Sequence, residues 1–365
     1  MRQRLVNLLA CPECGSTQLD LEVFERTDEE IMSGVFRCRD CRREFPIIAG
    51  VPRFLPDALL ATLSRYHPDY FAHYRVALPA KHEDSAVSRT LDFFTMQRPE
   101  LHDAQLAPAL TTYLERNLDV RIPGARSFNG KFGLDAGGGE GRYSYVLTRY
   151  GAEVVSMDLG NSVDFAFRRL QATRAAHVVQ ASIYQPPFRS GIFDFVMSIG
   201  VLHHLPDPHA GFDALTRLVL PDGTMHVWVY GLQQMSAMYR LSHLTTLRRL
   251  TSGLSPRSTY LLSLPIAAAL EALLFWPSRA LRQVPVTRDR VDPQVAEIAS
   301  LPFSVVAAEV HDRIGAPVTH FPTAEEVGRW YREAGFQNVV VQQTPGGRGW
   351  SGCGSAPSAV SLLSR

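Results

Sequence analysis

The chain has almost no net charge, because 37 lysine and arginine residues stand against 36 aspartate and glutamate residues over 365 positions. Proteins whose main task is to grip nucleic acid usually carry a clear basic excess. Nucleic acid is therefore disfavoured as a general partner, although local basic patches stay open. The length itself predicts two or three domains rather than one.

The sequence also lacks a long, uninterrupted apolar run. The longest, 260–276, contains Pro265 and Glu271 and falls short of the roughly 20 apolar residues that a membrane-spanning helix needs. The opening MRQRLVNLLACPEC has only a short apolar run and no cleavage-site pattern, so we expect no secretory signal. Together these absences predict a cytoplasmic protein.

Cysteine is nearly absent beyond residue 41, since four of the five cysteines lie within residues 1–41. Cys11 and Cys14 form one CxxC pair, and Cys38 and Cys41 form a second. Two such pairs supply the four thiolates of a closed tetrahedral site, which structural zinc prefers. We therefore expect a structural Zn²⁺ ion. Disulfide pairing and redox use of one CxxC pair are the alternatives.

The residues around these cysteines resemble a known family. The segments CPEC, CRDC and EFPIIAGVP resemble the small zinc-ribbon family of methyltransferase activators. The resemblance implies that residues 1–56 form a zinc-ribbon domain that supports a catalytic neighbour. Residues 57–129 follow with helix-like and charged pieces broken by proline and glycine, and we expect them to form a helical connector.

Strand-like and helix-like segments alternate in residues 130–235. The strand-like segments are KFGLDA, EVVSMD, HVVQAS, FDFVMSIG and TMHVWVYG. Such alternation predicts a doubly wound, Rossmann-like α/β fold with a mostly parallel sheet, here expected to have seven strands.

The turn after the first strand, DAGGGEGR, is rich in glycine, which lets the backbone come close to a ligand. The dinucleotide fingerprint GxGxxG/A requires a small residue where Arg142 stands, which argues against a dinucleotide. The spacing Asp-x-Gly-x-Gly-x-Gly fits instead, through Asp135, Gly137, Gly139 and Gly141. It resembles motif I of the class I S-adenosylmethionine-dependent methyltransferases. The resemblance implies that S-adenosylmethionine is the cofactor, with Asp135 near its ammonium group.

Residues further along the chain extend this resemblance. Asp158 ends the second strand, where a carboxylate can accept both hydroxyls of a ribose, with an ordinary surface turn as the alternative. The stretch QASIYQPPFRSGIFDFVMSIGVLHHLPDP also resembles this family. It implies adenine contacts from Ser182 and Ile183 and a cofactor contact from Ile199. Ser182 stands where the family usually has aspartate, so we expect weaker binding at a site that survives.

Two histidines follow the fourth strand, at the edge where open α/β sheets bind ligands. Methyl transfer from a sulfonium needs alignment above all, and it needs a base only where the acceptor loses a proton. His204, and with less support His203, are therefore the candidates for a catalytic group near the acceptor. The alternative is that His204 packs against and caps the loop before Pro206.

The alternation stops in residues 236–316, where the sequence is apolar and rich in arginine. The segment is longer than a plain connection, and we expect a helical insertion that acts as a lid. Residues 236–290 suit contact with an anionic membrane surface, which would make the protein peripheral to the membrane. The alternatives are a surface that binds an acidic or glycosylated metabolite, a hairpin that completes the core, and a dimer contact.

Residues 317–365 are expected to complete the catalytic domain. Thr323 suits the start of a last helix and Gly335 its end. The glycine-rich segment TPGGRGWSGCGS predicts a flexible tail, in which Cys353 has no assigned role.

Three functions are consistent with these patterns. The first is methyl transfer to a small-molecule acceptor that is hydrophobic or biosynthetic. The second is an RNA methyltransferase with a zinc module, which the neutral charge and the segment SIGVLHH, in place of an amino-methylating motif, argue against. The third is a non-catalytic protein that binds the cofactor or a partner protein. No motif identifies the acceptor, the methylated atom or the oligomeric state.

Overall fold

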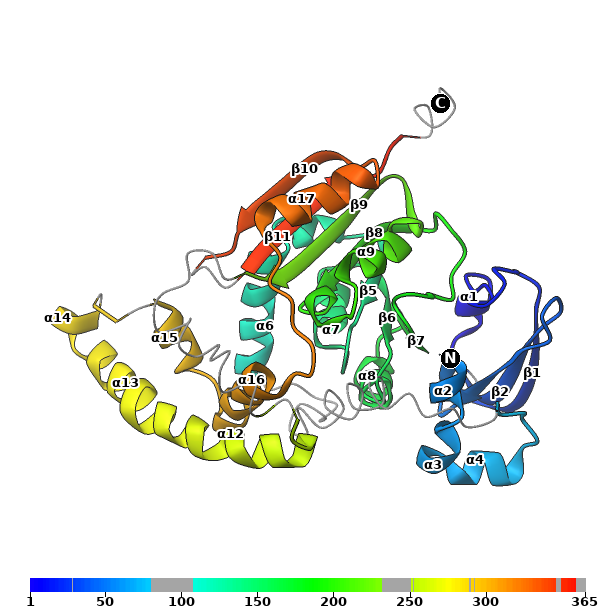
Figure 1. The fold of residues 1–365 in the computed structure, drawn as a ribbon, viewed down its shortest axis with the longest axis horizontal. Helices are drawn as coiled ribbons and strands as arrows, with labels where there is room; N and C mark the ends of the chain where they lie inside the picture. Colours follow the sequence, from blue (N-terminus) through cyan, green and yellow to red (C-terminus); the bar gives the residue numbers. More distant parts are fainter. Residues whose placement is uncertain are drawn as a thin grey trace.

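A single mixed β-sheet runs through the molecule (Figure 1). The computed structural model describes residues 1–358 apart from 28, 80–107, 232–250, 252, 289, 292 and 346–348. In these residues the sheet has eleven strands in the order β1-β2-β3-β4-β7-β6-β5-β8-β9-β11-β10. The strands are β1 Leu19–Arg26, β2 Ile31–Cys38, β3 Glu44–Ile48, β4 Val51–Phe54, β5 Phe132–Ala136, β6 Glu153–Asp158, β7 Ala176–Ala181, β8 Phe193–Ile199, β9 Val219–Tyr230, β10 Gln337–Gln343 and β11 Gly349–Ser355.

The doubly wound α/β prediction is confirmed, but the expected number of seven strands is wrong for the whole sheet. Strands β5 to β9 are parallel, and at one edge β11 pairs antiparallel with β9 while β10 pairs antiparallel with β11. These make seven. The other four come from the N-terminal ribbon, because β4 pairs in parallel with the edge strand β7 and extends the sheet.

Helices cover both faces of the parallel strands because neighbouring strand residues point to opposite faces. Val154 is buried in a cluster with α6 (Pro108–Arg121) and α7 (Arg142–Arg149). Val155 is buried in a larger cluster that includes residues of α9 (Pro208–Thr216) and α17 (Ala324–Glu333). The remaining short helices are α1 Gln3–Val6, α2 Asp57–Leu60, α3 Leu63–Tyr66, α4 Pro68–His73, η2 Ala125–Phe128, α8 Val163–Leu170 and η3 Leu202–His204.

A buried arginine joins the ribbon to the rest of the sheet. The side chain of Arg53, on β4, is fully buried, and burial lowers the pKa of its guanidinium. It donates to Gln180 Oε1 at 2.7 Å and to Asp164 Oδ1 at 2.5 Å. Gln180 in turn donates through Nε2 to the carbonyl of Leu159 at 3.1 Å. The ribbon is therefore bonded to the loop and helix that follow β6.

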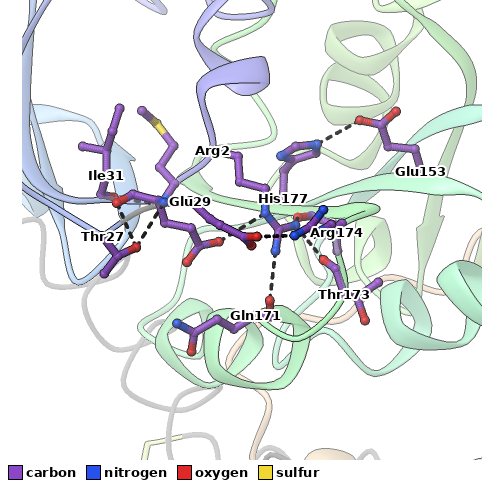
Figure 2. A network of polar contacts seen from close by, with 12 residues as sticks. Arg2, Thr27, Glu29, Ile31, Glu153, Gln171, Thr173, Arg174 and His177 are labelled. Carbon is purple, nitrogen blue, oxygen red and sulfur yellow. Dashed lines mark hydrogen bonds and ion pairs between the residues drawn. The ribbon is translucent and has the colours of Figure 1, made fainter.

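A second set of contacts lies where the start of the chain meets the loop between α8 and β7 (Figure 2). Arg2 donates to the carbonyl oxygens of Gln171 at 2.9 Å and Thr173 at 2.6 Å. Glu29 forms an ion pair with Arg174, and both of these side chains are largely exposed. Besides the strand pairing and the Arg2 hydrogen bonds, the ribbon thus contacts the core through the buried Arg53 and through two more exposed ion pairs, Glu29 with Arg174 and Arg4 with Glu153.

Close packing also constrains the ribbon at Gly50. A Cβ atom placed on Gly50 would lie 2.3 Å from the Phe167 ring of α8, and its φ of +80° is one that side chains rarely adopt. Glycine is required here for both reasons. Val51 beside it is buried with residues of α8 and β7.

The prediction of a flexible glycine-rich tail is wrong for residues 349–355. They form β11, which lies between β9 and β10 and is mostly buried. Cβ atoms at Gly352 and Gly354 would lie 2.9 Å and 2.8 Å from the Tyr331 ring. The glycines therefore make room for a helix packed on the strand. The helix ends predicted for α17 are confirmed, with a capping box at Thr323 and a φ of +78° at Gly335.

Helices fill the described residues between β9 and α17. They are α12 Pro256–Leu270, η4 Glu271–Phe275, α13 Trp276–Gln283, α14 Pro285–Arg288, α15 Pro293–Ile298 and α16 Phe303–Gly315. The helix continues through Pro265 and passes into a π-helical turn at Glu271. By length and composition Pro256–Gln283 could cross a membrane, which corrects the expectation that this apolar run is too short. The lid role stays a prediction, and residues 236–250 lie outside the described part.

The buried ion pair at the ribbon junction leads to a stability prediction. Asp164→Ala leaves the buried charge of Arg53 without its carboxylate, and we expect the free energy of unfolding to fall by about 3 kcal/mol or more. Glu29→Ala removes the exposed junction pair with Arg174 and should cost less than about 1 kcal/mol. Urea unfolding of both variants measures the difference. Equal losses of unfolding free energy in the two variants would contradict the conclusion that the buried Arg53 joins the ribbon to the core.

Candidate cofactor and metal sites

The glycine-rich turn lies at the point where the strand order reverses. From β5 the chain continues to β6 and β7 on one side, and it then returns to β8 on the other side of β5. Open α/β sheets bind ligands in the crevice at the carboxyl ends of these strands. Gly137, Gly139 and Gly141 follow β5 with φ values of +84°, +56° and +76°. Glycine is the residue that adopts such left-handed values without strain.

The structure brings this turn together with Asp158, as the sequence predicts. The backbone N–H of Gly139 donates to Asp158 Oδ2 at 2.9 Å, and that of Gly160 donates to Oδ1 at 2.7 Å. Burial raises the pKa of Asp158, and the two N–H groups act against that rise. A carboxylate has about four acceptor positions, so lone pairs remain for ribose hydroxyls. The glycine-rich turn thus holds Asp158 in position beside the predicted cofactor site.

Asp135 is more enclosed than its predicted role suggests. It is 2% exposed, and Ser144 Oγ donates to its Oδ2 at 2.7 Å. Burial raises the pKa of the Asp135 carboxyl from 3.8 to about 7, although the bond from Ser144 favours the ionised form. The carboxyl therefore lies under the turn and contacts α7. Its contact with a cofactor ammonium group stays a prediction.

The residues predicted to contact the adenine, Ser182 and Ile183, and the further cofactor contact Ile199 lie at the ends of the neighbouring strands. Ser182 and Ile183 follow β7, Ile199 ends β8, and each is 7% exposed. The Ser182 hydroxyl accepts from the backbone N–H of Tyr184 at 3.2 Å. This hydroxyl therefore already has one partner within its own loop.

His203 and His204 form a buried cluster with β9 and α16. His204 Nδ1 bonds the carbonyl of Val318 at 2.8 Å, and its Nε2 lies 3.8 Å from Asp312 Oδ1. Tyr230 donates its hydroxyl to Asp312 Oδ2 at 2.6 Å. The His203 ring packs against Tyr230 with ring centroids 4.0 Å apart. The cluster therefore joins the turn after β8 to the end of β9 and to α16.

The glycine turn and the histidine turn touch each other. A Cβ atom on Gly137 would lie 2.4 Å from Val201 Cγ2, and the His204 N–H donates to the Val201 carbonyl at 2.8 Å. The two predicted groups of site residues thus meet across the pair of strands β5 and β8.

Sequence reasoning missed two members of this cluster. Asp312 lies on α16 beside residues such as Val310 and Ile314 that pack in an apolar cluster. An acid within such a helix was the available signal, since a buried carboxylate needs a partner. Tyr230 ends β9 and carried no distinguishing signal in the sequence.

The four N-terminal cysteines form a cluster that fits a metal ion. Their sulfur atoms all lie within 4.8 Å of one another, with Cys11 to Cys41 and Cys14 to Cys38 each at 3.6 Å. Four sulfurs bound tetrahedrally at 2.3 Å from Zn²⁺ would lie about 3.8 Å apart. The donor set and its spacing are therefore compatible with zinc. Such an ion would have a structural role, because it would hold the two CxxC turns together.

Two family models match separate parts of the chain. Residues 134–227 match the methyltransferase domain family, and residues 2–50 match the family described as Trm112p-like protein. The chain carries a methyltransferase domain behind a Trm112p-like module. The methyltransferase match covers the glycine turn, Asp158 and the two histidines. Both resemblances stated for the sequence are confirmed.

Curated relatives match between a quarter and a third of the chain. An uncharacterized protein of Synechococcus is 36% identical over 103 residues, which are 27% of this chain and 25% of that protein. The ubiquinone biosynthesis O-methyltransferase of Psychrobacter arcticus is 36% identical over 101 residues, 26% of this chain and 38% of the enzyme. The chain therefore spans well under half the length of these relatives.

Solved structures include similar chains at low identity. The 1,6-didemethyltoxoflavin-N1-methyltransferase of Burkholderia thailandensis, solved with S-adenosylhomocysteine, is 15% identical at a TM-score of 0.43. It covers 78% of this chain and 94% of its own.

The cysteine cluster leads to a metal-content prediction. Cys14→Ser removes one thiolate, and we expect the purified protein to lose most of its bound zinc and to unfold at a lower temperature. Cys353→Ser changes the cysteine that lies outside the cluster, on β11, and should keep the full zinc content. Elemental analysis and thermal unfolding measure both. Full zinc content in the Cys14 variant would exclude this cluster as the metal site.

Asp135 leads to a pH prediction. Its folded pKa of about 7 lies above its ordinary value of 3.8, so it stabilises the fold below about pH 4, and this stability is lost as the pH rises through 7. Asp135→Asn abolishes that loss. We expect the stability of the variant relative to the natural protein to improve by about 2 to 4 kcal/mol between pH 4 and pH 8. Urea unfolding at both pH values measures this difference, and a constant difference would refute the assignment.

Proposed function

We propose that the protein binds S-adenosylmethionine and transfers its methyl group to a small, hydrophobic or biosynthetic acceptor. The observation that carries the proposal is the contact between the Gly139 backbone and Asp158, at the reversal of the strand order. It supports a ligand that brings a ribose beside bare backbone. The match of residues 134–227 to methyltransferase domains supports the same activity.

The acceptor is proposed from the relatives. Several of the curated relatives are named ubiquinone biosynthesis O-methyltransferase, which favours a biosynthetic acceptor methylated on oxygen. The neutral charge of the whole chain does not favour RNA as the substrate. We therefore place the small-molecule acceptor before the RNA alternative.

The cofactor supplies a methyl group that is already activated by its sulfonium. The residues of this chain have the task of aligning and enclosing the reactants, which is an effect worth roughly 7 to 11 kcal/mol in favourable systems. Asp158 would hold the ribose hydroxyls, and the turn at Gly137 to Gly141 would admit the cofactor without steric clash. Ser182 and Ile183 would line the adenine, and Ile199 would contact the cofactor.

His204 is the proposed base for an acceptor that must lose a proton. Its Nδ1 faces the carbonyl of Val318, which can only accept, so Nδ1 carries the proton and Nε2 is the basic atom of the neutral ring. Asp312 lies on the Nε2 side and would stabilise the ring after it takes up a proton. His203, packed between His204 and Tyr230, would keep the pair in place.

A matched pair of glycine variants tests cofactor binding. Cβ atoms at Gly139 and at Gly130 both meet no protein atom within 4 Å, and both residues have a positive φ. The strain of an alanine should therefore be similar at the two sites, whereas only Gly139 lies beside Asp158. We expect Gly139→Ala to weaken S-adenosylmethionine binding about tenfold or more and Gly130→Ala to leave it nearly unchanged.

Isothermal titration calorimetry with S-adenosylmethionine and S-adenosylhomocysteine measures these affinities. No heat with either compound, together with binding of a nicotinamide dinucleotide, would overturn the proposal. Transfer of labelled methyl groups into a lipid extract, a polar metabolite extract and RNA then separates the acceptor classes. Label in RNA alone would favour the second function, and cofactor binding without any transfer would favour a non-catalytic protein.

A further inference from the structure

The helices α12, η4 and α13 form a continuous helix, Pro256–Gln283, that presents one face to the protein. Thr259, Ser263, Ala267 and Phe275 recur at about helical spacing and are buried. Ala267 and Phe275 belong to a cluster with residues of α16. The inner face of this helix is therefore buried by packing against other residues of the same chain.

The outer face of the same helix is apolar as well. Leu273 is 81% exposed, Trp276 is 71% exposed and Leu261 is 58% exposed. The other exposed residues between 259 and 281 are also apolar: Pro265, Ala268, Ala269, Ala272, Ala280 and Leu281. A helix that is apolar on both faces is normally buried on both. The described residues leave this surface, which we call the arm face, exposed.

The helix extends away from the sheet, so the arm face is not directed at the catalytic strands. Figure 1 shows α12 and α13 in yellow as an arm that runs outward from below α16 and leads to α14. Val286 of α14, which is 77% exposed, continues the apolar surface beyond the end of the helix. This arrangement presents one long apolar strip to a large surface, and a small ligand would cover little of it.

Positive charge flanks the arm face at both ends. Arg257 and Arg282 are exposed at the start and at the end of the helix. Glu271 is the single acid in residues 253–287, and it is paired with Arg279 at 2.8 Å. An apolar strip with arginines at its ends matches the interface of an anionic lipid surface, where the charges contact headgroups.

Two other occupants fit the charges less well. A second copy paired along the arm face, in either direction, would bring arginine ends against arginine ends, with the acid already neutralised. A membrane-spanning position satisfies length and composition, since Pro256–Gln283 has 28 residues and an 18-residue window within it has a mean hydropathy of 1.6. However, α16 packs on the inner face and carries Asp312 and Arg313, which would have to enter the hydrocarbon.

We propose that the arm lies flat on an anionic membrane surface, with Leu273 and Trp276 inserted among the acyl chains and Arg257 and Arg282 at the headgroups. This interaction goes beyond the proposed function and does not depend on it. Trp276 suits this depth, because an indole ring has an apolar body and a polar N–H. The proposal thus names the side chains for the membrane contact that the sequence predicts in residues 236–290.

Flotation of the full-length, zinc-loaded protein with lipid vesicles tests the proposal. We expect it to float with vesicles of phosphatidylcholine mixed with phosphatidylglycerol, and to float less with phosphatidylcholine alone. The double variant Leu273→Glu with Trp276→Glu should lose flotation. Val340→Glu places the same charge on an exposed apolar residue of β10, 55% exposed, and should leave flotation unchanged.

Arginine variants test the electrostatic part. Arg257→Gln and Arg282→Gln should each weaken binding to the mixed vesicles roughly fivefold and reduce its sensitivity to salt. Arg65→Gln, at an exposed site of α3 in the first third of the chain, should not weaken it. Calorimetry with S-adenosylmethionine on the same variants should give unchanged affinities. Failure of lipid binding and failure of the proposed function are thus distinguished.

Tryptophan fluorescence gives a direct readout of insertion. Trp228, Trp330 and Trp350 are at most 9% exposed, so a blue shift and quenching by brominated lipid should come from Trp276. Trp276→Phe should abolish the quenching while the protein still floats. Flotation that survives the double glutamate variant, absence of flotation, or lipid-independent dimers that the double variant disrupts would each overturn the proposal.

Discussion

The arrangement of the two modules depends on one buried charge. The guanidinium of Arg53 extends from the ribbon into the interior, where it donates hydrogen bonds to Gln180 and Asp164. A buried charge costs several kcal/mol without such partners, so the ribbon strand β4 and helix α8 are tied to one relative position. Gln180 also bonds the carbonyl of Leu159, directly after Asp158. The same junction therefore supports the ribbon and the loop on which cofactor binding would depend.

In the candidate site, too, residues from different parts of the chain hold one another in position. The N–H of Gly139 holds Asp158, and Gly137 leaves space for Val201, which leads into the turn with His204. Each candidate side chain is oriented by a neighbouring turn rather than by its own element alone. Asp312 completes the set from α16, the helix that also packs beneath the arm face. The arm and the histidine cluster thus share one supporting helix.

Local chemistry made several features predictable from the sequence. Alternating apolar and helical segments predict β5 to β9, and the spacing of glycines predicts the turn because left-handed backbone favours glycine. The grouping of Cys11, Cys14, Cys38 and Cys41 into one cluster is predictable from the two CxxC motifs, since a four-thiolate metal site needs two such turns. These signals are short in range, so neighbouring residues encode them completely.

What the tertiary structure decided depends on contacts between distant residues. The sheet has eleven strands because β4 reaches the edge of β7, a pairing that neither segment encodes alone. The glycines of β11 resembled a flexible tail, yet they are required by the Tyr331 ring packed on them. Likewise, Asp312 meets His204 only after α16 folds back. By itself the sequence determined the local elements and the metal and cofactor motifs, whereas packing decided which of their surfaces became interfaces, because burial depends on partners far away in the chain.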